Sequence, residues 1–438
     1  MKYIKREENG KIVWKREPKA LLSSTKIKEV EAMEIEKAKE LATEDKVIWL
    51  YSKINGLKKE VQRASCYISS PPIIILVERS YFLRDSFEQF RTTTDLDLRR
   101  ELKIHFVDEL CQDAGGLIRE WFSVLIEELV SEKFGLFVRT NTPMVSYTIN
   151  VTSKKFHANH LEYFFFCGQI IAKALFERIP IKAYLAKFIL KNLLNEKIME
   201  EDLKYFDSEL WKSIEFLKNN SIQSEFCIGT FTAVRRDAIE QKDETINLKK
   251  NGDKILISEE NKAEFIKLLY QYHLVESIRE QLNALSLGIS SLISKDIIYV
   301  LDCDELEFLL CGDQEISITD WKDNTHYKGT YHKNHPVIKW FWEVLSNLSS
   351  NELEKFLQFC TGSTRVPIEG FKGLTSNNGK LCCFSIEPKA YESEEMNFIV
   401  AHTCFNRIEL PVYPSKESME KSIRKIISTP ICYQFSFE

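Results

Sequence analysis

The alternation of apolar and polar residues divides the chain into a long, mainly helical part and a shorter mixed part. Apolar residues recur at helical spacing through 117–130 and 161–176, and the second stretch is apolar on nearly every face, as in a helix at the centre of a core. Residues 73–77 follow two prolines and are short, apolar and β-branched, which predicts a buried strand at the start of a globular unit. The long part therefore begins near residue 71.

The segments outside these core helices differ in composition and in the elements that they predict. Residues 1–70 are rich in Lys and Glu, and 25–43 carry only a loose apolar stripe, which predicts a charged, largely helical arm. Apolar runs at 246–249 and 254–257 flank Asn251 and Gly252, a dipeptide suited to a type I′ turn, so a hairpin is predicted there.

After Cys311-Gly312-Asp313 the pattern changes to a smaller mixed unit. Residues 349–352, Ser-Ser-Asn-Glu, form a capping box that predicts the start of a helix. Two strand-like runs follow at 381–386 and 398–401, and apolar residues at i, i+4, i+7 and i+8 predict a last helix from Met419. The fold class is α+β, in three sections: 1–70, 71–312 and 313–438.

Composition limits the classes of function. The 438 residues carry 60 basic and 65 acidic side chains, and this net charge of −5 gives no attraction to nucleic acid. The start of the chain lacks the apolar core of a secretory signal, and no apolar run reaches the ~18 residues of a membrane span. We expect a cytoplasmic location, and the nucleus is also compatible.

The cysteines and the phosphate-binding motifs narrow the chemistry further. The 11 cysteines are odd in number and never fall in a C-x-x-C spacing, so neither a zinc site nor a disulfide framework is indicated. Most should be reduced and buried, as small apolar side chains. Without a P-loop, G-x-G-x-x-G or H-E-x-x-H motif, we expect no metal and no cofactor.

The best candidate for chemistry is Cys404, just after an apolar strand. On an extended backbone residues i and i+2 share a face, so His402 would lie beside Cys404. A neighbouring imidazolium stabilises the thiolate, which is the nucleophilic form. The competing interpretation, an inert buried cysteine at a strand end, is the more common outcome for any one of 11 thiols.

A family resemblance favours the nucleophile. The run 402–406, His-Thr-Cys-Phe-Asn, followed by Leu410-Pro411 and a terminal helix, resembles the active-site signature of HECT ubiquitin ligases. Further segments resemble motifs of that family in the same order: 102–106, 113–122, 161–164 with Gly168, 251–252, 260–262, 311–327, 338–342 and 358–367. The resemblance covers roughly residues 73–438.

The resemblance implies a bilobal HECT domain. A mainly helical N-lobe (71–312) would contain a small subdomain that binds the conjugating enzyme (about 185–260), a hinge would lie near Gly312 to Glu315, and a smaller α/β C-lobe would carry the catalytic cysteine. Partners would be ubiquitin, a ubiquitin-conjugating enzyme and protein substrates. Motif order suggests Leu194, Leu210 and Phe231 as docking residues, although apolar residues at such spacing more often face the core.

The resemblance also suggests roles for individual residues. Cys404 would hold ubiquitin as a thioester and pass it to a substrate lysine. His402 and Thr403 would polarise the thioester or position the ubiquitin tail, Phe435 would assist transfer to substrate, and Glu438 would accept the lysine proton. Each has a plainer alternative, a satisfied strand histidine or an ordinary solvated tail. The chain departs from the family where Phe398 and Ile399 replace Leu-Pro, which affects loop geometry more than reaction type.

Two other functions use the same residues. A cysteine protease needs a thiol and an oriented imidazole. The spacing selects none of the candidate histidines for the imidazole: His157, His160, His326, His332 and His335. A catalytically silent interaction scaffold would keep the fold without activity. Retention of Cys404 and its neighbours argues against the scaffold.

Overall fold

The structure is a computed structural model of the whole chain. It describes residues 2–8, 11–17, 24–64, 71–109, 116–142, 146–222, 229–236, 243–312, 316–363, 366–367, 370–374, 381–391 and 398–428. Helices predominate and the sheets are small, so the predicted α+β class is confirmed. Two large hydrophobic clusters organise the described residues, one from Val47 to Cys311 and the other from Trp321 to Ile427. We call the parts built around them the first and second bodies.

The first body is built around two long helices. Helix α8 (His160–Glu177) is buried along most of its length, which confirms the predicted core helix, and it packs along α12 (Arg279–Leu292). The other helices of this body that follow residue 71 are α4 (Phe82–Thr92), α5 (Asp95–Leu98), α6 (Gly116–Val130), α7 (Ser153–Phe156), α9 (Lys187–Leu193), α10 (Ser208–Asn219), α11 (Lys262–Leu274), α13 (Lys295–Ile298) and α14 (Cys303–Cys311).

Two glycines allow the backbones of α8 and α12 to approach closely. A Cβ added at Gly168 would lie 2.1 Å from the carbonyl oxygen of Leu285, and one added at Gly288 would lie 1.9 Å from that of Phe165. Only glycine fits at such positions, because any larger side chain meets backbone atoms that cannot rotate away. The two glycines thus fix the packing distance at the centre of the first body.

The N-terminal arm belongs to the first body. It contains the antiparallel strands β1 (Lys2–Glu8) and β2 (Lys11–Glu17) and the helices α1 (Ser24–Ala32), α2 (Ile35–Ala38) and α3 (Thr43–Ala64). The single helix predicted at 25–43 is therefore wrong, since two shorter helices occupy that stretch and the long helix follows it. Leu50 and Ile54 of α3 are buried in the same cluster as Ile75. The charged composition of the arm concealed this apolar face.

The arm packs against α14, the last helix before the second body. Trp14 stacks on Phe308 with ring centroids 4.7 Å apart, and Lys5 pairs with Asp304. Lys46 lies 3.0 Å from the Glu305 carboxylate, and both side chains are almost fully buried. The capping box between Asp302 and Glu305 starts the same helix. The arm thus braces the chain next to the junction between the two bodies.

Small sheets complete the first body. The parallel pair β3 (Ile73–Val77) and β4 (Leu102–Phe106) corrects the predicted buried strand, because alternate residues Ile74 and Leu76 are 50% and 54% exposed. The other pairs are β5 (Phe137–Arg139) with β6 (Tyr147–Ile149), and β7 (Thr232–Arg236) with β8 (Asp243–Asn247). The hairpin predicted around residues 251–252 is wrong, since β8 pairs with the preceding strand β7. Asn251 does adopt the left-handed conformation (φ 57°), but it leads into a short 3-10 turn.

The second body is a four-stranded sheet covered by helices. The strands β9 (His326–Tyr327), β10 (Ser385–Lys389), β11 (Val400–His402) and β12 (Arg407–Pro411) lie in the order β11-β12-β10-β9. The helices are α15 (Ile318–Asp323), α16 (Pro336–Ser346), α17 (Ser350–Thr361) and α18 (Lys416–Ser428). The predicted capping box at Ser349 is confirmed. The last helix is also confirmed, with Met419, Ile423, Ile426 and Ile427 buried.

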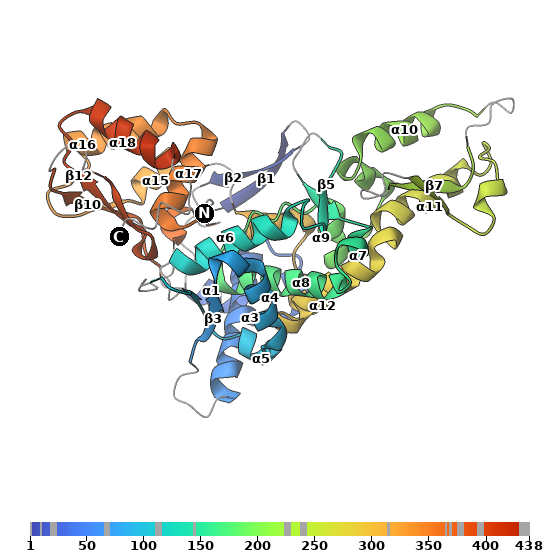
Figure 1. Cartoon of the computed structure of the whole chain (residues 1–438), viewed down its shortest axis with the longest axis horizontal. Coiled ribbons are helices and arrows are strands. Elements are labelled where there is room, and N and C mark those ends of the chain that lie inside the picture. Colours follow the sequence, from blue (N-terminus) through green and yellow to red (C-terminus); the bar gives the residue numbers. More distant parts are fainter. Residues whose placement is uncertain are drawn as a thin grey trace.

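The two bodies lie at different places along the longest axis of the molecule. Figure 1 shows the second body at one end, with α10 and β7 of the first body at the other end and the core helices between them. Gly312, which ends α14 with φ 68°, connects the bodies. Residues 313–315 of the predicted hinge lie outside the described residues. The sheet that carries Cys404 is therefore held far from the α10–β7 region.

Candidate active site

Cys404 lies in a tight turn between two paired strands. Strand β11 ends at His402, residues Thr403–Phe405 form one turn of 3-10 helix, and β12 begins at Arg407. The strands are antiparallel and pair His402 with Arg407. We call residues 402–407 the cysteine turn. The side chain of Cys404 lies outside the described residues, but its backbone is fixed by the strands on both sides.

Asn406 holds the turn in shape. It is fully buried and adopts the left-handed conformation (φ 47°, ψ 46°), which asparagine tolerates better than most residues. Its side-chain Nδ2 donates to the carbonyl oxygen of Cys382 at 2.8 Å. Its backbone N–H donates to Thr403 O at 3.2 Å, and its own carbonyl accepts from Ser385 N–H at 2.9 Å. The turn is thereby tied to the segment before β10, and the backbone at Cys404 is preorganised.

His402 is held by a carboxylate on the neighbouring strand. The extended backbone ends at His402 and a 3-10 turn follows, so the position of the imidazole beside Cys404 stays a prediction. His402 Nε2 lies 2.9 Å from Glu409 Oε1, and the two side chains are 28% and 33% exposed. An ionised carboxylate only accepts, so Nε2 carries the proton in this hydrogen bond. Glu409 is an orienting group that the motif comparison did not single out.

The other predicted site residues have different surroundings. Thr403 is buried, at 7% exposure, and its carbonyl accepts from Asn406 as described above. Phe435 and Glu438 lie outside the described residues. Among the histidines proposed for a protease, His157 and His160 belong to the first body and bond to Phe134 O and Ser153 Oγ. His335 caps α16 through Nδ1, which accepts from Val337 N–H.

The cysteines whose side chains the structure describes fall into two groups. Cys167, Cys303, Cys311 and Cys360 are buried, and burial raises the pKa of each thiol, for Cys303 to about 12. These are the inert thiols that the sequence predicted. Cys382 and Cys383 are only partly buried and precede β10. Cys382 Sγ donates to Phe405 O at 3.1 Å, so a second thiol touches the cysteine turn.

An arginine of the first body also reaches the cysteine turn. Arg119 on α6 is 8% exposed, and its Nη1 donates to Asn406 Oδ1 at 3.0 Å and to Thr361 O at 2.8 Å. The sequence showed Arg119 only as one letter of a motif. Its partners are 242 and 287 residues further along the chain, a pairing that no local pattern could reveal.

The residues proposed for docking are mostly core residues. Leu194 and Phe231 are 4% and 0% exposed, and Leu210 is half-buried against the same cluster. Leu194 and Phe231 therefore cannot anchor a partner, and the more common core interpretation holds for them. Among the described residues of 185–260, the exposed large apolar side chains are Met199, Phe216, Val234 and Leu256, with 40%, 68%, 56% and 57% exposure. Sequence spacing does not distinguish these from their buried neighbours.

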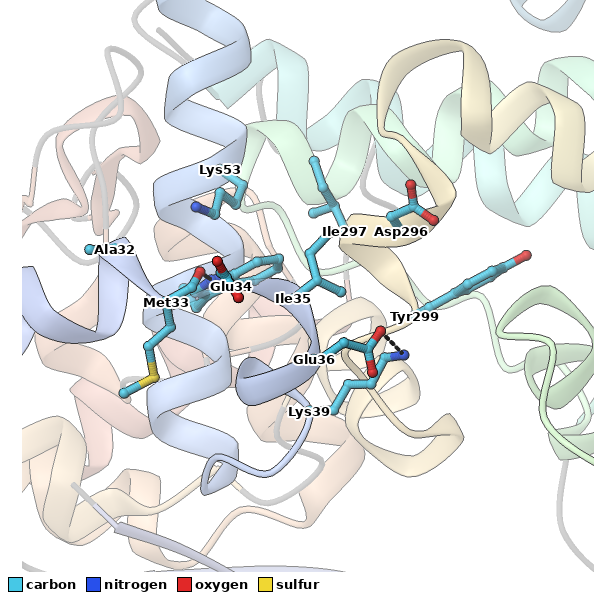
Figure 2. A pocket seen from close by; sticks show the side chains of 11 residues that line it. Ala32, Met33, Glu34, Ile35, Glu36, Lys39, Lys53, Asp296, Ile297 and Tyr299 are labelled. Atoms are coloured by element: carbon cyan, nitrogen blue, oxygen red, sulfur yellow. Dashed lines mark hydrogen bonds and ion pairs between the residues drawn. The ribbon is translucent and has the colours of Figure 1, made fainter.

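Two grooves open elsewhere on the surface. One, of about 630 Å³, lies between the arm and α13, and Figure 2 shows Ile35 of α2 and Ile297 of α13 on its walls with Lys53 of α3 nearby. The other, of about 670 Å³, lies between β5–β6 and β7, with His273 on its wall. None of the described residues that line these two grooves belongs to the cysteine turn.

Within the described ranges the structure contains no cluster of three or more His, Cys, Asp or Glu side chains that would hold a metal ion. A search of the same residues finds no helix long and apolar enough to cross a membrane.

Comparison with known proteins gives a consistent picture. Residues 123–437 match the family model described as HECT-domain (ubiquitin-transferase). The chain is 35% identical over 357 residues to E3 ubiquitin-protein ligase Nedd-4 of Drosophila melanogaster, covering 81% of this chain and 34% of that protein. It is 34% identical over 374 residues to pub1 of Schizosaccharomyces pombe (84% and 48%) and 32% identical over 383 residues to RSP5 of Saccharomyces cerevisiae (85% and 46%), both also named E3 ubiquitin-protein ligases. The matched region thus spans at most about half the length of these relatives.

Proposed function

This chain belongs to the HECT-domain family, and we propose that it is a ubiquitin-protein ligase that carries ubiquitin as a thioester on Cys404. The observation that carries the proposal is the cysteine turn within the matched region, where Cys404 stands on a backbone fixed between β11 and β12 and by the buried Asn406. A nucleophile held in this way starts the reaction without first ordering its own loop.

The proposed reaction has two transfers. The Cys404 thiolate attacks the thioester carbonyl of ubiquitin on the conjugating enzyme, a new C–S bond forms, and the conjugating enzyme leaves as its own thiolate. A substrate lysine, having lost a proton, then attacks the Cys404 thioester. An isopeptide bond forms, the C–S bond breaks and Cys404 returns as thiolate. The low basicity of a thiolate suits it both as attacking group and as leaving group.

In this proposal the two bodies are the two lobes of the domain. The first body, with its arm, is the N-lobe, and the second body, which carries the cysteine turn, is the C-lobe. The positive φ of Gly312 and the change of cluster across it support a hinge at 312–315. Movement there would bring Cys404 first to the donor and then to the acceptor.

We place conjugating-enzyme docking in the α10–β7 region of the first body. Phe216 on α10 and Val234 on β7 are exposed apolar side chains on a small unit at the end of the molecule, where a weak partner needs a few anchors to bury. They replace Leu194 and Phe231, whose burial prevents contact. Leu210 remains a supporting residue beneath this surface.

Roles for the neighbouring residues follow the proposed chemistry. His402, oriented by Glu409, is placed to polarise groups at the edge of the turn, and Thr403 helps to form the turn through its backbone. Phe435 would assist transfer to substrate and Glu438 would accept the proton of the attacking lysine. Substrate proteins would be recruited by surfaces of this chain or by chain regions like those that lengthen its relatives.

The test is a thioester assay with activating enzyme, conjugating enzyme, ATP and fluorescent ubiquitin on a non-reducing gel. The wild-type protein is expected to form an adduct that a thiol reductant removes, and Cys404→Ala is expected to abolish it. Cys404→Ser should form an oxyester that resists the reductant, because an alkoxide is a poorer leaving group than a thiolate.

Cys383→Ala is the matched control, because Cys383 is a partly exposed thiol of the same body that lies outside the cysteine turn. This variant should form the ubiquitin thioester, a step called charging below, as fast as the wild type does. Equal charging by Cys404→Ala would refute the assignment of the nucleophile. Cleavage of a peptide without conjugating enzyme would support the cysteine protease, and absence of both reactions would support the silent scaffold.

A further inference from the structure

The contact of Arg119 with the cysteine turn joins the two bodies at a buried point. Arg119 comes from α6 of the first body, and both of its acceptors, Asn406 and Thr361, are fully buried residues of the second body. Hydrogen bonds from a guanidinium are among the stronger ones in proteins, and burial protects them from competition with water. The contact therefore favours one orientation of the two bodies.

Asn406 has no freedom to replace this donor with another arrangement of its side chain. Its Nδ2 donates to Cys382 O and its Oδ1 accepts from Arg119, so the amide orientation is fixed by a partner that only accepts and another that only donates. Asn406 is also the residue that shapes the turn around Cys404. Loss of Arg119 thus removes one of the bonds that hold the turn itself.

Thr361 provides Arg119 with a second hydrogen-bond acceptor in the second body. Helix α17 ends at Thr361 and is followed by Gly362 in the left-handed conformation, so the Thr361 carbonyl is one of the free acceptors at a helix C-terminus. A cation at this end also interacts favourably with the helix dipole. Arg119 therefore caps a helix of the other body, and the positive charge is brought to the base of the turn.

The orientation fixed in this way is one in which Cys404 is remote from the α10–β7 region. Figure 1 shows α6 on the side of the first body that adjoins the second body, with α10 and β7 at the opposite end. A conjugating enzyme docked there meets Cys404 only after the second body has moved, and that movement must break the Arg119 bonds. The orientation that Arg119 favours is suited to the second transfer, from Cys404 to lysine, in which ubiquitin has already left the conjugating enzyme.

We propose that Arg119 is a positioning residue that locks the second body and the cysteine turn in the orientation for discharge of ubiquitin onto lysine, and that this lock opens during charging. The inference rests on the proposed ligase function and deepens it. During discharge the guanidinium beside the turn keeps the backbone around the thioester fixed while the amine attacks the carbonyl and the thiolate leaves.

The experiment separates the two steps in Arg119→Ala. Charging is measured as a single turnover from a preloaded conjugating enzyme, and discharge is measured by chasing the isolated Cys404 thioester with free lysine. Arg119→Ala is expected to charge at least as fast as wild type, because the lock no longer has to open, and to discharge at least tenfold more slowly. Discharge within threefold of wild type, or a parallel fall in both rates, would overturn the proposal.

The control is Lys182→Ala. Lys182 also bridges the bodies, pairing with Glu354 of α17 at 2.9 Å, but it is 38% exposed and does not touch the cysteine turn. We expect both of its rates to stay within twofold of wild type, since exposed ion pairs contribute little. A tenfold fall in its discharge rate would mean that any bridge between the bodies suffices and that Arg119 has no particular role.

A second measurement does not depend on ubiquitin. Hydrogen–deuterium exchange of the uncharged protein should be faster in Arg119→Ala over residues 402–407 and 357–363, with α18 unchanged. Unchanged exchange at both segments would refute the lock even if the protein proved not to be a ligase. Conversely, faster exchange in a protein that never forms a thioester would support the lock and refute only the proposed function.

Discussion

Two glycine substitutions are expected to have opposite effects on stability, because only one of the two glycines lies where α8 packs against α12. Gly168→Ala introduces a Cβ that would lie 2.1 Å from Leu285 O and 2.8 Å from Ile289 N, whereas a Cβ at Gly56, inside α3, meets nothing within 4 Å. Both glycines lie in helices, where alanine is intrinsically more favourable by about 1 kcal/mol. Tertiary contact alone therefore decides the sign of each effect.

The magnitude follows from how far the helices must move. Ordinary contact begins at 3.4 Å, so the Gly168 Cβ requires the backbones to separate by about 1 Å at the most buried helix pair of the first body. Overpacking of this kind costs about 3 kcal/mol, which exceeds the gain from propensity and leaves Gly168→Ala destabilised by about 2 kcal/mol. Gly56→Ala should instead be stabilised by about 0.5–1 kcal/mol.

Native-state hydrogen exchange is the suitable assay, because a chain with two bodies does not give one unfolding free energy. Amides of α8 and α12 should exchange faster in Gly168→Ala, while those of α16 and α18 in the second body serve as the internal reference. Amides of α3 should exchange more slowly in Gly56→Ala. If Gly168→Ala protected α8 and α12 as well, the close approach of their backbones would be refuted.

Three further predictions concern the buried ion pair, a partly buried histidine and the proposed docking surface. Lys46→Met should weaken the packing of the arm against the first body by about 3 kcal/mol, because it leaves the buried Glu305 carboxylate without its cation. The arm should then be cleaved faster in limited proteolysis, and resistance equal to wild type would contradict the prediction. Burial lowers the pKa of His273 to about 4, below its ordinary value, so the neutral imidazole stabilises the fold above about pH 6.5 and this contribution is lost as the pH falls toward 4. Native-state hydrogen exchange of α11, corrected for the intrinsic rate at each pH, should show a smaller loss of protection between pH 7 and pH 4.5 in His273→Gln than in wild type. Equal losses would disprove the assignment. Phe216→Ser should raise the conjugating-enzyme concentration needed for half-maximal charging about tenfold, because it removes an exposed apolar anchor, and it should leave discharge of the thioester unchanged. An unchanged concentration would show that the docking site does not include Phe216.

The sequence was informative wherever a local pattern has one structural solution. The apolar run at 161–176, the capping box at Ser349 and the spacing from Met419 to Ile427 each gave the helix that the structure contains. Local patterns failed where pairing decides the outcome. Residues 254–257 had the appearance of a strand, but β8 pairs with β7, and β3 alternates in burial because only one face of its sheet is covered.

At the candidate site, too, local patterns predicted some features and tertiary contacts decided others. The order of motifs in the sequence led to Cys404, and the comparisons support that family. The pairing of His402 with Glu409 was not predicted, because it joins side chains of two strands across the cysteine turn and local alternation describes one strand only. Exposure could not be inferred either, since Phe216 and Leu217 are adjacent apolar residues of one helix and only the second is buried.

The sequence by itself determined the helices with strong periodicity and the α+β class, and it led to Cys404 as the proposed nucleophile, because these depend on residues that are close together in the chain. Only the tertiary structure decided that the charged arm braces α14, that Asn406 fixes the cysteine turn and that Arg119 reaches it from the first body. The contacts of Lys46 with Glu305 and of Arg119 with Asn406 join residues hundreds of positions apart, and the contact of Asn406 with Cys382 joins residues 24 positions apart. Their energies depend on burial and distance, which arise only when the chain has folded.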